Sequence, residues 1–274
     1  RKQAEQAILF AKEQALQLSE AKEMFLSVMS HEIRTPLNAV IGMTHLLMES
    51  DPKPSQIDDL NILKFSGENL LNIINDVLDF TKIETGNLHL EFLPVNLQLL
   101  CNDIISSLQV NANQQENALQ LHFDKHIATL VLADKTRLYQ ILMNLLGNAI
   151  KFTKQDKVEL LVNIIDETSD KFVVSFKVRD NGIGIPSDKK EYIFETFTQA
   201  KSDISRKYGG TGLGLAITKK LLKLYQSDIK VESTEGKGTT FSFSIAFDKV
   251  PEKEPLALPK KAEFEGKRVL IVDD

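Results

Sequence analysis

The chain has little of what disulfide-bonded, zinc-binding or membrane-spanning proteins depend on. It contains one cysteine, Cys101, and no tryptophan in 274 residues. Because one cysteine cannot form an internal disulfide, the sequence gives no sign of an oxidising compartment, and we expect Cys101 to be a buried packing residue. None of the five histidines stands at a zinc-site spacing from cysteine or carboxylates.

Long apolar runs and strong basic charge are also missing. No stretch approaches the ~20 apolar residues that span a bilayer, and no signal peptide is visible. The net charge of -5 disfavours non-specific nucleic-acid binding, so we expect no nucleic-acid partner. The chain starts at Arg1 without Met and stops at Asp274 inside an apparent strand, so we expect a piece of a longer protein.

Helix is what the first third of the chain has in abundance. Residues 1–50 carry apolar side chains at a 4–3 spacing, typical of a weak coiled coil, which fits either a solvated helix with one packed face or a signal-carrying helix. Pro36 should bend it, and a break at 51–55 precedes a second helix at 56–84. A lone hairpin exposes too much apolar surface, so we expect two copies to pair as a dimeric four-helix bundle.

From Leu88 the pattern becomes a mixture of strands and helices. The expected strands are 88–92, 119–124, 158–166, 172–179, 228–233 and 239–247, and the expected helices are 96–113, 135–152 and 212–225. This predicts a two-layer α/β sandwich, an antiparallel sheet with helices on one face. Residues 249–266 are typical of a linker, and 267–274 of a buried strand that ends in two acids.

The first candidate for chemistry is His31, in the run Ser30-His31-Glu32-Ile33-Arg34-Thr35-Pro36. Imidazole is largely neutral near pH 7 and is then a nucleophile. Glu32 can accept a proton from one ring nitrogen and leave the other free to attack. Taken alone, a His-Glu dipeptide on a helix is most often an ordinary surface pair.

Two glycine-containing segments fit a nucleotide. Asp180, Gly182 and Gly184 follow a strand, where the carboxylate can accept from an adenine amine, although a tight turn also explains them. The second segment opens a helix and can present N–H groups to phosphate. Its residues are Gly210, Thr211, Gly212, Leu213 and Gly214. It lacks the Lys-Ser/Thr of a Walker loop and does not follow a strand as a Rossmann loop does.

The helix expected at 135–152 carries Asn144 and Asn148 on one face. An amide oxygen can bind Mg²⁺, and Lys151, one turn on, can reach phosphate. A pair of satisfied core amides is the alternative.

The polar segment 186–209 is typical of a mobile lid with Phe194 and Phe197 as apolar anchors. Arg206 or Lys207 can neutralise a phosphoryl group there, or they are solvated loop charges.

In this order and spacing the motifs resemble those of the sensor histidine kinases of two-component signalling. His31 to Pro36 matches the H box, Asn144 to Phe152 the N box, Asp180 to Gly184 the first glycine box, Phe194 to Phe197 the F box, and Gly210 to Gly214 the second glycine box. The end of the chain is similar to the first strand of a receiver domain. Where many members have a Gly-rich turn, this chain has Leu224-Tyr225-Gln226-Ser227-Asp228.

The resemblance implies a role for individual residues. His31 is the phosphoacceptor, Glu32 assists as a base, and Thr35 orients a water for dephosphorylation of a partner regulator. Asn148 holds Mg²⁺ and Asn144 is a further metal or phosphate contact. Asp180 reads the adenine amine and Phe152 lies beside the nucleotide.

The resemblance also implies a division of the chain. A signalling helix (1–25) leads to a dimerisation and phosphotransfer hairpin (26–85), an ATPase domain of the gyrase and chaperone type (88–248), a linker (249–266) and the start of a receiver domain (267–274). The implied cofactors are ATP and Mg²⁺. The implied partners are a second copy, a receiver domain in the same or another chain, and an upstream sensor domain, in the cytoplasmic portion of a membrane-anchored sensor.

The expected function is therefore ATP-dependent autophosphorylation of His31, followed by transfer to a receiver aspartate. Three alternatives remain at this point. They are a phosphatase-biased form in which Thr35 matters most, a non-catalytic nucleotide-sensing scaffold, and a gyrase- or chaperone-like ATPase.

Overall fold

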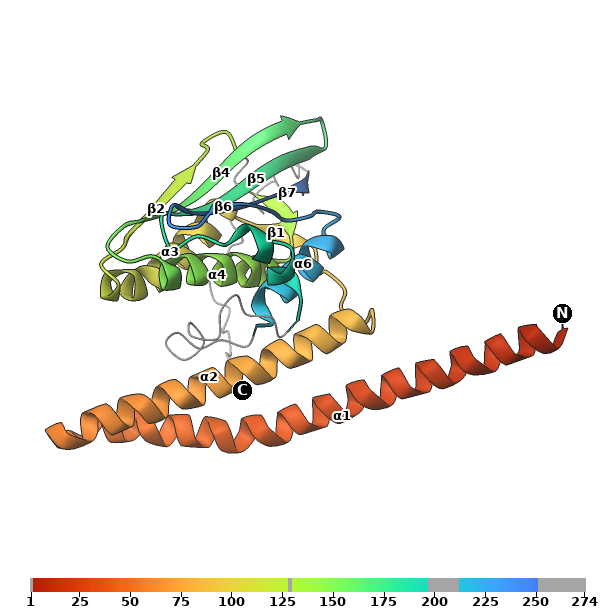
Figure 1. Ribbon diagram of the computed structural model, residues 1–274, viewed down its shortest axis with the longest axis horizontal. Coiled ribbons are helices and arrows are strands. Elements are labelled where there is room, and N and C mark those ends of the chain that lie inside the picture. Colours follow the sequence, from red (N-terminus) through yellow and green to blue (C-terminus); the bar gives the residue numbers. More distant parts are fainter. Residues whose placement is uncertain (1, 128–129, 197–211, 251–274) are drawn as a thin grey trace, which may run out of the picture.

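A helical hairpin lies beneath an α/β sandwich in the computed structural model, which describes residues 2–127, 130–196 and 212–250 (Figure 1). The hairpin consists of α1 (Lys2–Glu49) and α2 (Pro54–Glu84), as the sequence predicted. α1 continues through Pro36 and reaches far beyond the end of α2 (Figure 1). Pro54 occupies the first turn of α2, where its missing N–H has no intrahelical partner to lose.

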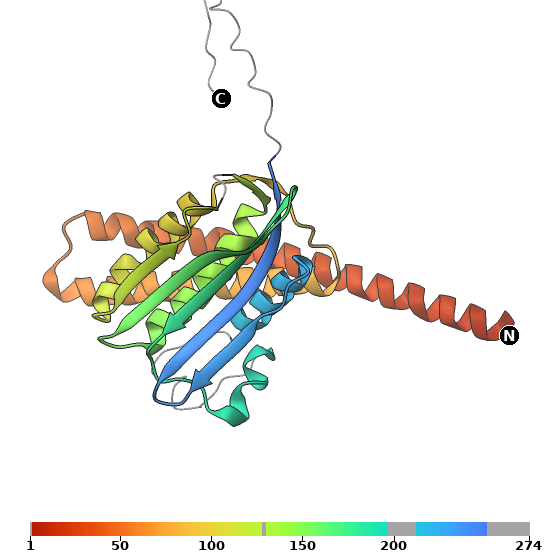
Figure 2. The same ribbon diagram turned by 90° about the horizontal axis from the view of Figure 1, so that it is seen from above.

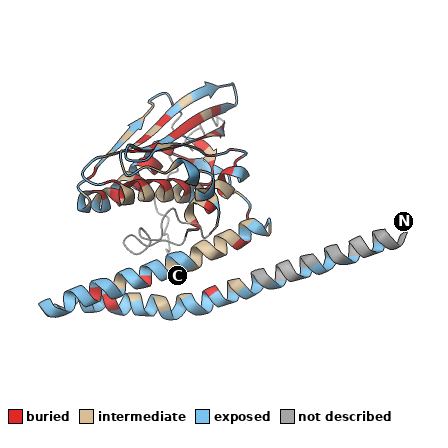
Figure 3. Cartoon of the chain, in the orientation of Figure 1, coloured by how far each residue is buried: buried red, intermediate tan, exposed pale blue. Residues whose placement is uncertain are grey.

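The two hairpin helices approach closely at Gly67. This glycine is buried, and a methyl group in its place would lie 2.8 Å from Cγ1 of Ile41. Among the hairpin side chains that the structure describes, most of the others are exposed (Figure 3). Its exposed apolar side chains include Val40, Met43, Leu46, Leu47, Ile62, Leu63, Phe65, Leu70 and Ile73.

The sandwich has one sheet and a layer of helices on one of its faces (Figures 1 and 2). The strands are β1 (Leu93–Val95), β2 (Ala118–Phe123), β3 (Val131–Ala133), β4 (Lys157–Glu167), β5 (Lys171–Asp180), β6 (Lys230–Thr234) and β7 (Gly238–Lys249). The helices are α3 (Leu97–Gln114), α4 (Lys135–Phe152) and α6 (Gly214–Leu224), with short 3-10 turns η1 (Ser187–Lys189) and η2 (Tyr192–Phe194). The strand order is β1-β3-β7-β5-β4-β2, and β6 pairs with β7.

Three details differ from the sequence-based expectation. The sheet is mixed rather than antiparallel, because β2 runs parallel to β4. Residues 88–92 are not a strand, and the chain pairs only from Leu93, against the short strand β3. β3 was missed because three residues are too few to show an alternating pattern.

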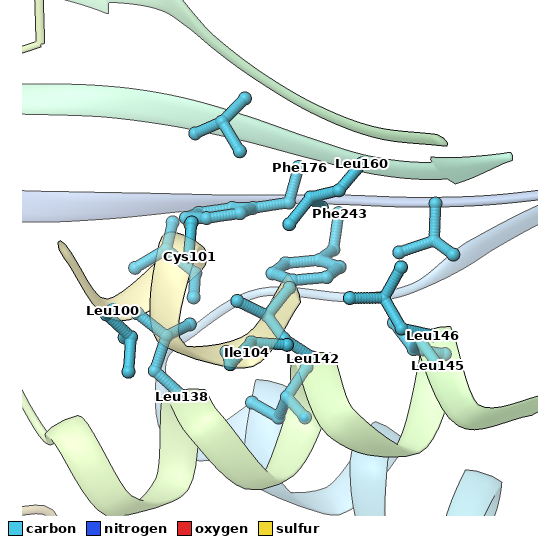
Figure 4. Close-up of a cluster of buried hydrophobic side chains, with 14 of the residues drawn as sticks. Leu100, Cys101, Ile104, Leu138, Leu142, Leu145, Leu146, Leu160, Phe176 and Phe243 are labelled. Carbon is cyan, nitrogen blue, oxygen red and sulfur yellow. The ribbon is translucent and has the colours of Figure 1, made fainter. Parts of the chain in front are cut away.

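The core lies between the sheet and the helices. Leucines of α3 and α4 fill the space under Phe176 and Phe243, whose stacked rings lie 5.0 Å apart (Figure 4). Cys101 is buried among them, and burial raises the pKa of its thiol to about 12, so it is an unreactive packing residue as expected. Among the described residues, no helix is long and apolar enough to cross a membrane.

Candidate functional site

His31 projects from α1 into solvent, with 76% of its side chain exposed. Its Nδ1 lies 3.6 Å from Oε1 of Glu32, so the acid is on the Nδ1 side of the ring. The Thr35 hydroxyl donates to the His31 carbonyl oxygen at 3.1 Å, one helical turn on. Arg34 donates to Oδ1 of Asn75 at 3.2 Å and so ties this part of α1 to α2. The imidazole is therefore accessible on a braced helix.

The two asparagines of α4 meet the start of α6. Nδ2 of Asn144 donates to the Thr218 hydroxyl at 2.8 Å, and Nδ2 of Asn148 lies 3.4 Å from Oδ1 of Asn144. A methyl group on Gly214 would overlap the Asn144 side chain. Asn144 thus packs α4 against α6, as the core-amide alternative supposed, and it also brings Asn148 to the glycine segment.

Asp180 ends β5 as a buried carboxyl group. Its Oδ1 accepts from the N–H groups of Gly182 at 2.9 Å and Thr239 at 3.2 Å, whereas Oδ2 has no hydrogen bond within the described part of the chain. Burial raises the pKa of Asp180, and the two N–H donors oppose that shift. A buried acceptor with one free oxygen suits an amine donor.

The glycines after Asp180 are needed for contacts with the protein's own backbone. A methyl group on Gly182 would overlap the carbonyl of Phe152, which accepts from the Ile183 N–H at 3.2 Å. Gly184 has φ +66° and lies against the carbonyl of Thr234. The loop is therefore held between the end of α4 and the β6–β7 turn.

Two more predicted residues, Lys151 and Phe152, lie at the end of α4, where the Phe152 carbonyl meets this loop. The Lys151 ammonium lies 5.1 Å from the ring centroid of Phe152. Partial burial lowers the pKa of Lys151.

The second glycine segment is described only from Gly212 onward. Gly212 has φ +68°, Leu213 is buried, and α6 begins at Gly214 without a side-chain cap in the described structure. An uncapped helix start presents N–H groups to an anion.

The predicted lid is described only in part. Its described end includes Phe194, whose ring packs edge-on against Phe241 with centroids 6.3 Å apart. The other residues assigned to the lid and its glycines lie outside the described residues, namely Phe197, Arg206, Lys207, Gly210 and Thr211.

The sequence analysis did not identify two residues that are joined to Asp180 by hydrogen bonds, Thr239 directly and Ser233 through Thr239. Thr239 donates its N–H to Asp180, and Ser233 bonds to the Thr239 hydroxyl at 2.9 Å. The run Gly236-Lys237-Gly238-Thr239 was a usable signal, because paired glycines before a strand indicate a close backbone approach.

A further contact joins the hairpin to the sandwich. Asp79 of α2 accepts from Arg137 at 3.0 Å and Gln140 at 2.8 Å, both on α4. Lys220 of α6 pairs with Glu84 and lies 4.8 Å from the ring centroid of Phe80. The last turns of α2 therefore hold the sandwich at two points.

The chain matches two families of known domains in sequence. Residues 21–86 match the His Kinase A (phospho-acceptor) domain. Residues 133–249 match the histidine kinase-, DNA gyrase B-, and HSP90-like ATPase. The first match contains His31, and the second contains both asparagines and both glycine segments.

Individual relatives agree with these domains. The signal transduction histidine-protein kinase BarA of Escherichia coli (strain K12) is 42% identical over 263 residues, which cover 96% of this chain and 28% of that protein. Hybrid signal transduction histidine kinase K of Dictyostelium discoideum is 38% identical, over 97% of this chain and 23% of that protein. The chain thus spans about a quarter of the length of these relatives.

A solved structure is similar in fold as well as in sequence. The crystal structure of full-length ShkA in complex with AMPPNP superposes with a TM-score of 0.68 at 33% identity, over 83% of this chain and 46% of that one. The accessible histidine on the hairpin, the buried carboxyl group of Asp180 and the start of α6, which has no side-chain cap in the described structure, agree with these relatives. The chain belongs to the sensor histidine kinases of two-component signalling, and it carries their phospho-acceptor hairpin and their ATP-binding sandwich.

Proposed function

We propose that His31 is the residue that this kinase phosphorylates. The observation that carries the proposal is the position of Glu32 on the Nδ1 side of an exposed imidazole. Nε2 attacks the γ-phosphorus of ATP, the bond to the β–γ bridging oxygen breaks, and ADP leaves. Glu32 takes the Nδ1 proton as the ring becomes positively charged, so the phosphohistidine ends neutral at the ring.

The nucleotide is proposed to lie between Asp180 and the start of α6. The free Oδ2 of Asp180 accepts from the adenine amine, and Phe152 and Lys151 lie at the same end of α4. The N–H groups that open α6 bind the phosphates, with Gly212, Leu213 and Gly214 shaping that turn. Gly210 and Thr211 extend the same loop, and Arg206 or Lys207 from the lid neutralise the transferred group.

Mg²⁺ is proposed to bind at Asn148, with Asn144 as its neighbour. The described residues contain no group of three His, Cys, Asp or Glu side chains that could hold a metal by themselves. An amide oxygen plus phosphate oxygens fits this donor set, because Mg²⁺ commonly completes its shell with substrate phosphates and water. Bound there, the ion would screen the charge of the phosphates.

We expect Asn148→Ala to abolish the transfer of label from γ-labelled ATP to the protein, while its oligomeric state stays unchanged.

The partners are proposed from the hairpin and from the relatives. The exposed apolar side chains of α1 and α2 fit a second copy, which would complete a four-helix bundle. The hybrid relative and the acidic end of the chain, outside the described residues, support transfer to a receiver aspartate in the same or another chain. We place this part of the protein on the cytoplasmic side of a membrane-anchored sensor, downstream of its sensor domain, because ATP is its substrate.

The domain limits belong to the same proposal. We assign 1–25 to a signalling helix, 26–85 to the phosphotransfer hairpin, 88–248 to the ATPase domain, 249–266 to a linker and 267–274 to a receiver.

A second candidate activity is dephosphorylation of the partner regulator. Thr35 is exposed one turn from His31, and its hydroxyl proton is engaged by the His31 carbonyl. Its oxygen lone pairs remain available to a water beside the imidazole. The test is to mix a phosphorylated receiver domain with wild type or with Thr35→Ala and to follow the loss of its phosphate. Dephosphorylation by wild type that is absent with Thr35→Ala would support this activity.

The deciding experiment is incubation with γ-labelled ATP and Mg²⁺, wild type beside His31→Ala and a control, His45→Ala, on the same helix. We expect acid-labile, base-stable label in wild type and His45→Ala and none in His31→Ala. Label that survives in His31→Ala would contradict the assignment. ATP binding without label in any variant would favour the phosphatase-biased form or the non-catalytic nucleotide-sensing scaffold.

A further inference from the structure

The hydroxyl of Ser233, on β6, lies at the meeting point of the two segments that frame Asp180. The first is the loop from Asp180 to Ile185, and the second is the turn from β6 into β7. The two are also joined by the Gly236 N–H, which donates to the Ile183 carbonyl at 2.7 Å. Gly238, at φ +103°, packs directly on the Asp180 carbonyl. Hydrogen bonds and close backbone contacts therefore join the two segments at this junction, and the side chain of Ile185 packs against the core.

Ser233 makes three hydrogen bonds there. Its oxygen lies 2.8 Å from the Ile185 nitrogen, 2.9 Å from the Gly238 carbonyl oxygen and 2.9 Å from the Thr239 hydroxyl oxygen. A serine hydroxyl has one proton to donate and two lone pairs that accept. These three neighbours therefore use its full capacity.

The direction of each bond follows from the chemistry of its partner. The Ile185 N–H can only donate and the Gly238 carbonyl can only accept. Ser233 therefore gives its single proton to Gly238, and the Thr239 hydroxyl must donate to Ser233. Thr239 is buried, and its proton is used inside the protein. Toward a bound base it can act only as an acceptor.

Thr239 is also coupled to the base-reading carboxyl group, because its N–H donates to Oδ1 of Asp180. Two acceptors, the free Oδ2 of Asp180 and the Thr239 hydroxyl oxygen, then belong to one framework. A base with an exocyclic amine offers donors to both. A base with a keto oxygen at that position places a third acceptor against them, which leaves buried polar groups unpaired.

We infer that Ser233 is a positioning residue that sets base selectivity, by orienting the Thr239 hydroxyl as an acceptor and fixing the glycine loop. It selects 6-amino purine nucleotides over 6-keto ones without touching the nucleotide. The inference rests on the proposed adenine site at Asp180. Removal of the Ser233 hydroxyl returns the Thr239 proton to the site, where it can meet a keto oxygen.

The test compares ATP with inosine triphosphate, which carries a keto oxygen in place of the amine. Dissociation constants are measured by calorimetry for wild type, Ser233→Ala, Ser233→Thr and Ser242→Ala. Ser242 lies on β7 and makes no side-chain hydrogen bond in the described structure, so it is the matched control. Thermal unfolding of each apo protein checks that it is folded.

We expect Ser233→Ala to weaken ATP binding about three- to tenfold, the effect of losing one or two ordinary hydrogen bonds, and to weaken inosine triphosphate binding much less. The ratio of the dissociation constant for inosine triphosphate to that for ATP therefore falls. KM for ATP rises, while kcat at saturating ATP stays unchanged. Ser233→Thr restores the preference because it keeps the hydroxyl, and Ser242→Ala behaves as wild type.

Two results would overturn the inference. One is a folded Ser233→Ala protein with the wild-type ATP preference. The other is equal weakening of both nucleotides, which indicates general loosening of the loop. Wild type that binds no ATP would instead refute the adenine site itself, so the two failures are distinguishable.

Discussion

In the proposed adenine site, Asp180 meets two opposing requirements. Holding an adenine amine favours the charged carboxylate, whereas burial disfavours that charge. The raised pKa of Asp180 records the second effect, and the N–H groups of Gly182 and Thr239 offset it only in part. At the residue scale, the proposed site therefore gains nucleotide binding at a cost in folding stability.

This conflict predicts opposite effects of Asp180→Asn on stability and on binding. The folded-state pKa of Asp180 lies above the unfolded value, so its ionisation disfavours the folded state above the unfolded pKa, about 4. The apo variant should unfold at a higher temperature than wild type at pH 7.5, and the difference should shrink as pH falls toward the unfolded pKa. ATP should bind about 10- to 100-fold more weakly, as expected for a lost hydrogen bond to a charged group.

Calorimetric unfolding at pH 5 and pH 7.5, with ATP titrations at pH 7.5, measures both effects. Asp170→Asn, in an exposed turn, is the control and should change neither. An apo Asp180→Asn protein that is less stable than wild type at pH 7.5 would show that the carboxylate is structural.

At the scale of elements, two glycines of the same domain should respond in opposite ways to alanine. Gly147 lies within α4 and a methyl group there meets nothing within 4 Å, so Gly147→Ala should stabilise the apo protein by about 0.5–1 kcal/mol. Gly184 has a left-handed backbone and faces the Thr234 carbonyl, so Gly184→Ala should destabilise by about 1–3 kcal/mol.

Urea unfolding of the two variants, analysed with a shared m-value, measures the difference. A free energy of unfolding for Gly184→Ala as high as that for Gly147→Ala would mean that the loop after β5 moves freely enough to accommodate a side chain. It would contradict the close packing of Gly184 on the Thr234 carbonyl.

The arrangement of the whole molecule depends on the contact between the hairpin and the sandwich. The sequence predicts each of these two units but not the contact between them. Asp79 accepts from both Arg137 and Gln140, and the Asp79 and Arg137 side chains are each 20% exposed. Asp79→Ala should weaken the docking of the sandwich on α2 by about 1 kcal/mol, because a partly exposed charged pair contributes little more. The average dimensions of the protein should increase as the undocked population grows.

Small-angle scattering of Asp79→Ala beside Asp59→Ala, an exposed α2 control, measures this change. A double-mutant cycle with Arg137→Ala separates the pair from other effects. An unchanged radius of gyration for Asp79→Ala would mean that Lys220, Glu84 and Phe80 hold the sandwich by themselves.

The sequence by itself determined the two long helices, the core helices α3 and α4, and the residue types that a kinase needs. Helical period and glycine breaks are local properties, so the run from Lys135 to Phe152 could be read directly. The resemblance of the motifs gave the family for the same reason, since order and spacing are properties of the chain.

Only the tertiary structure decided what depends on contacts between distant segments. No local pattern in the sequence relates the segments that meet in the parallel pairing of β2 with β4 or in the pairing of the short strand β3. The same is true of the hydrogen bonds that join Asp79 of α2 to α4. The same holds for Ser233, whose spacing from Asp180 in the sequence carries no signal. Its three hydrogen bonds exist because the sheet brings β6 beside the loop that follows β5, and that closeness is a property of the fold.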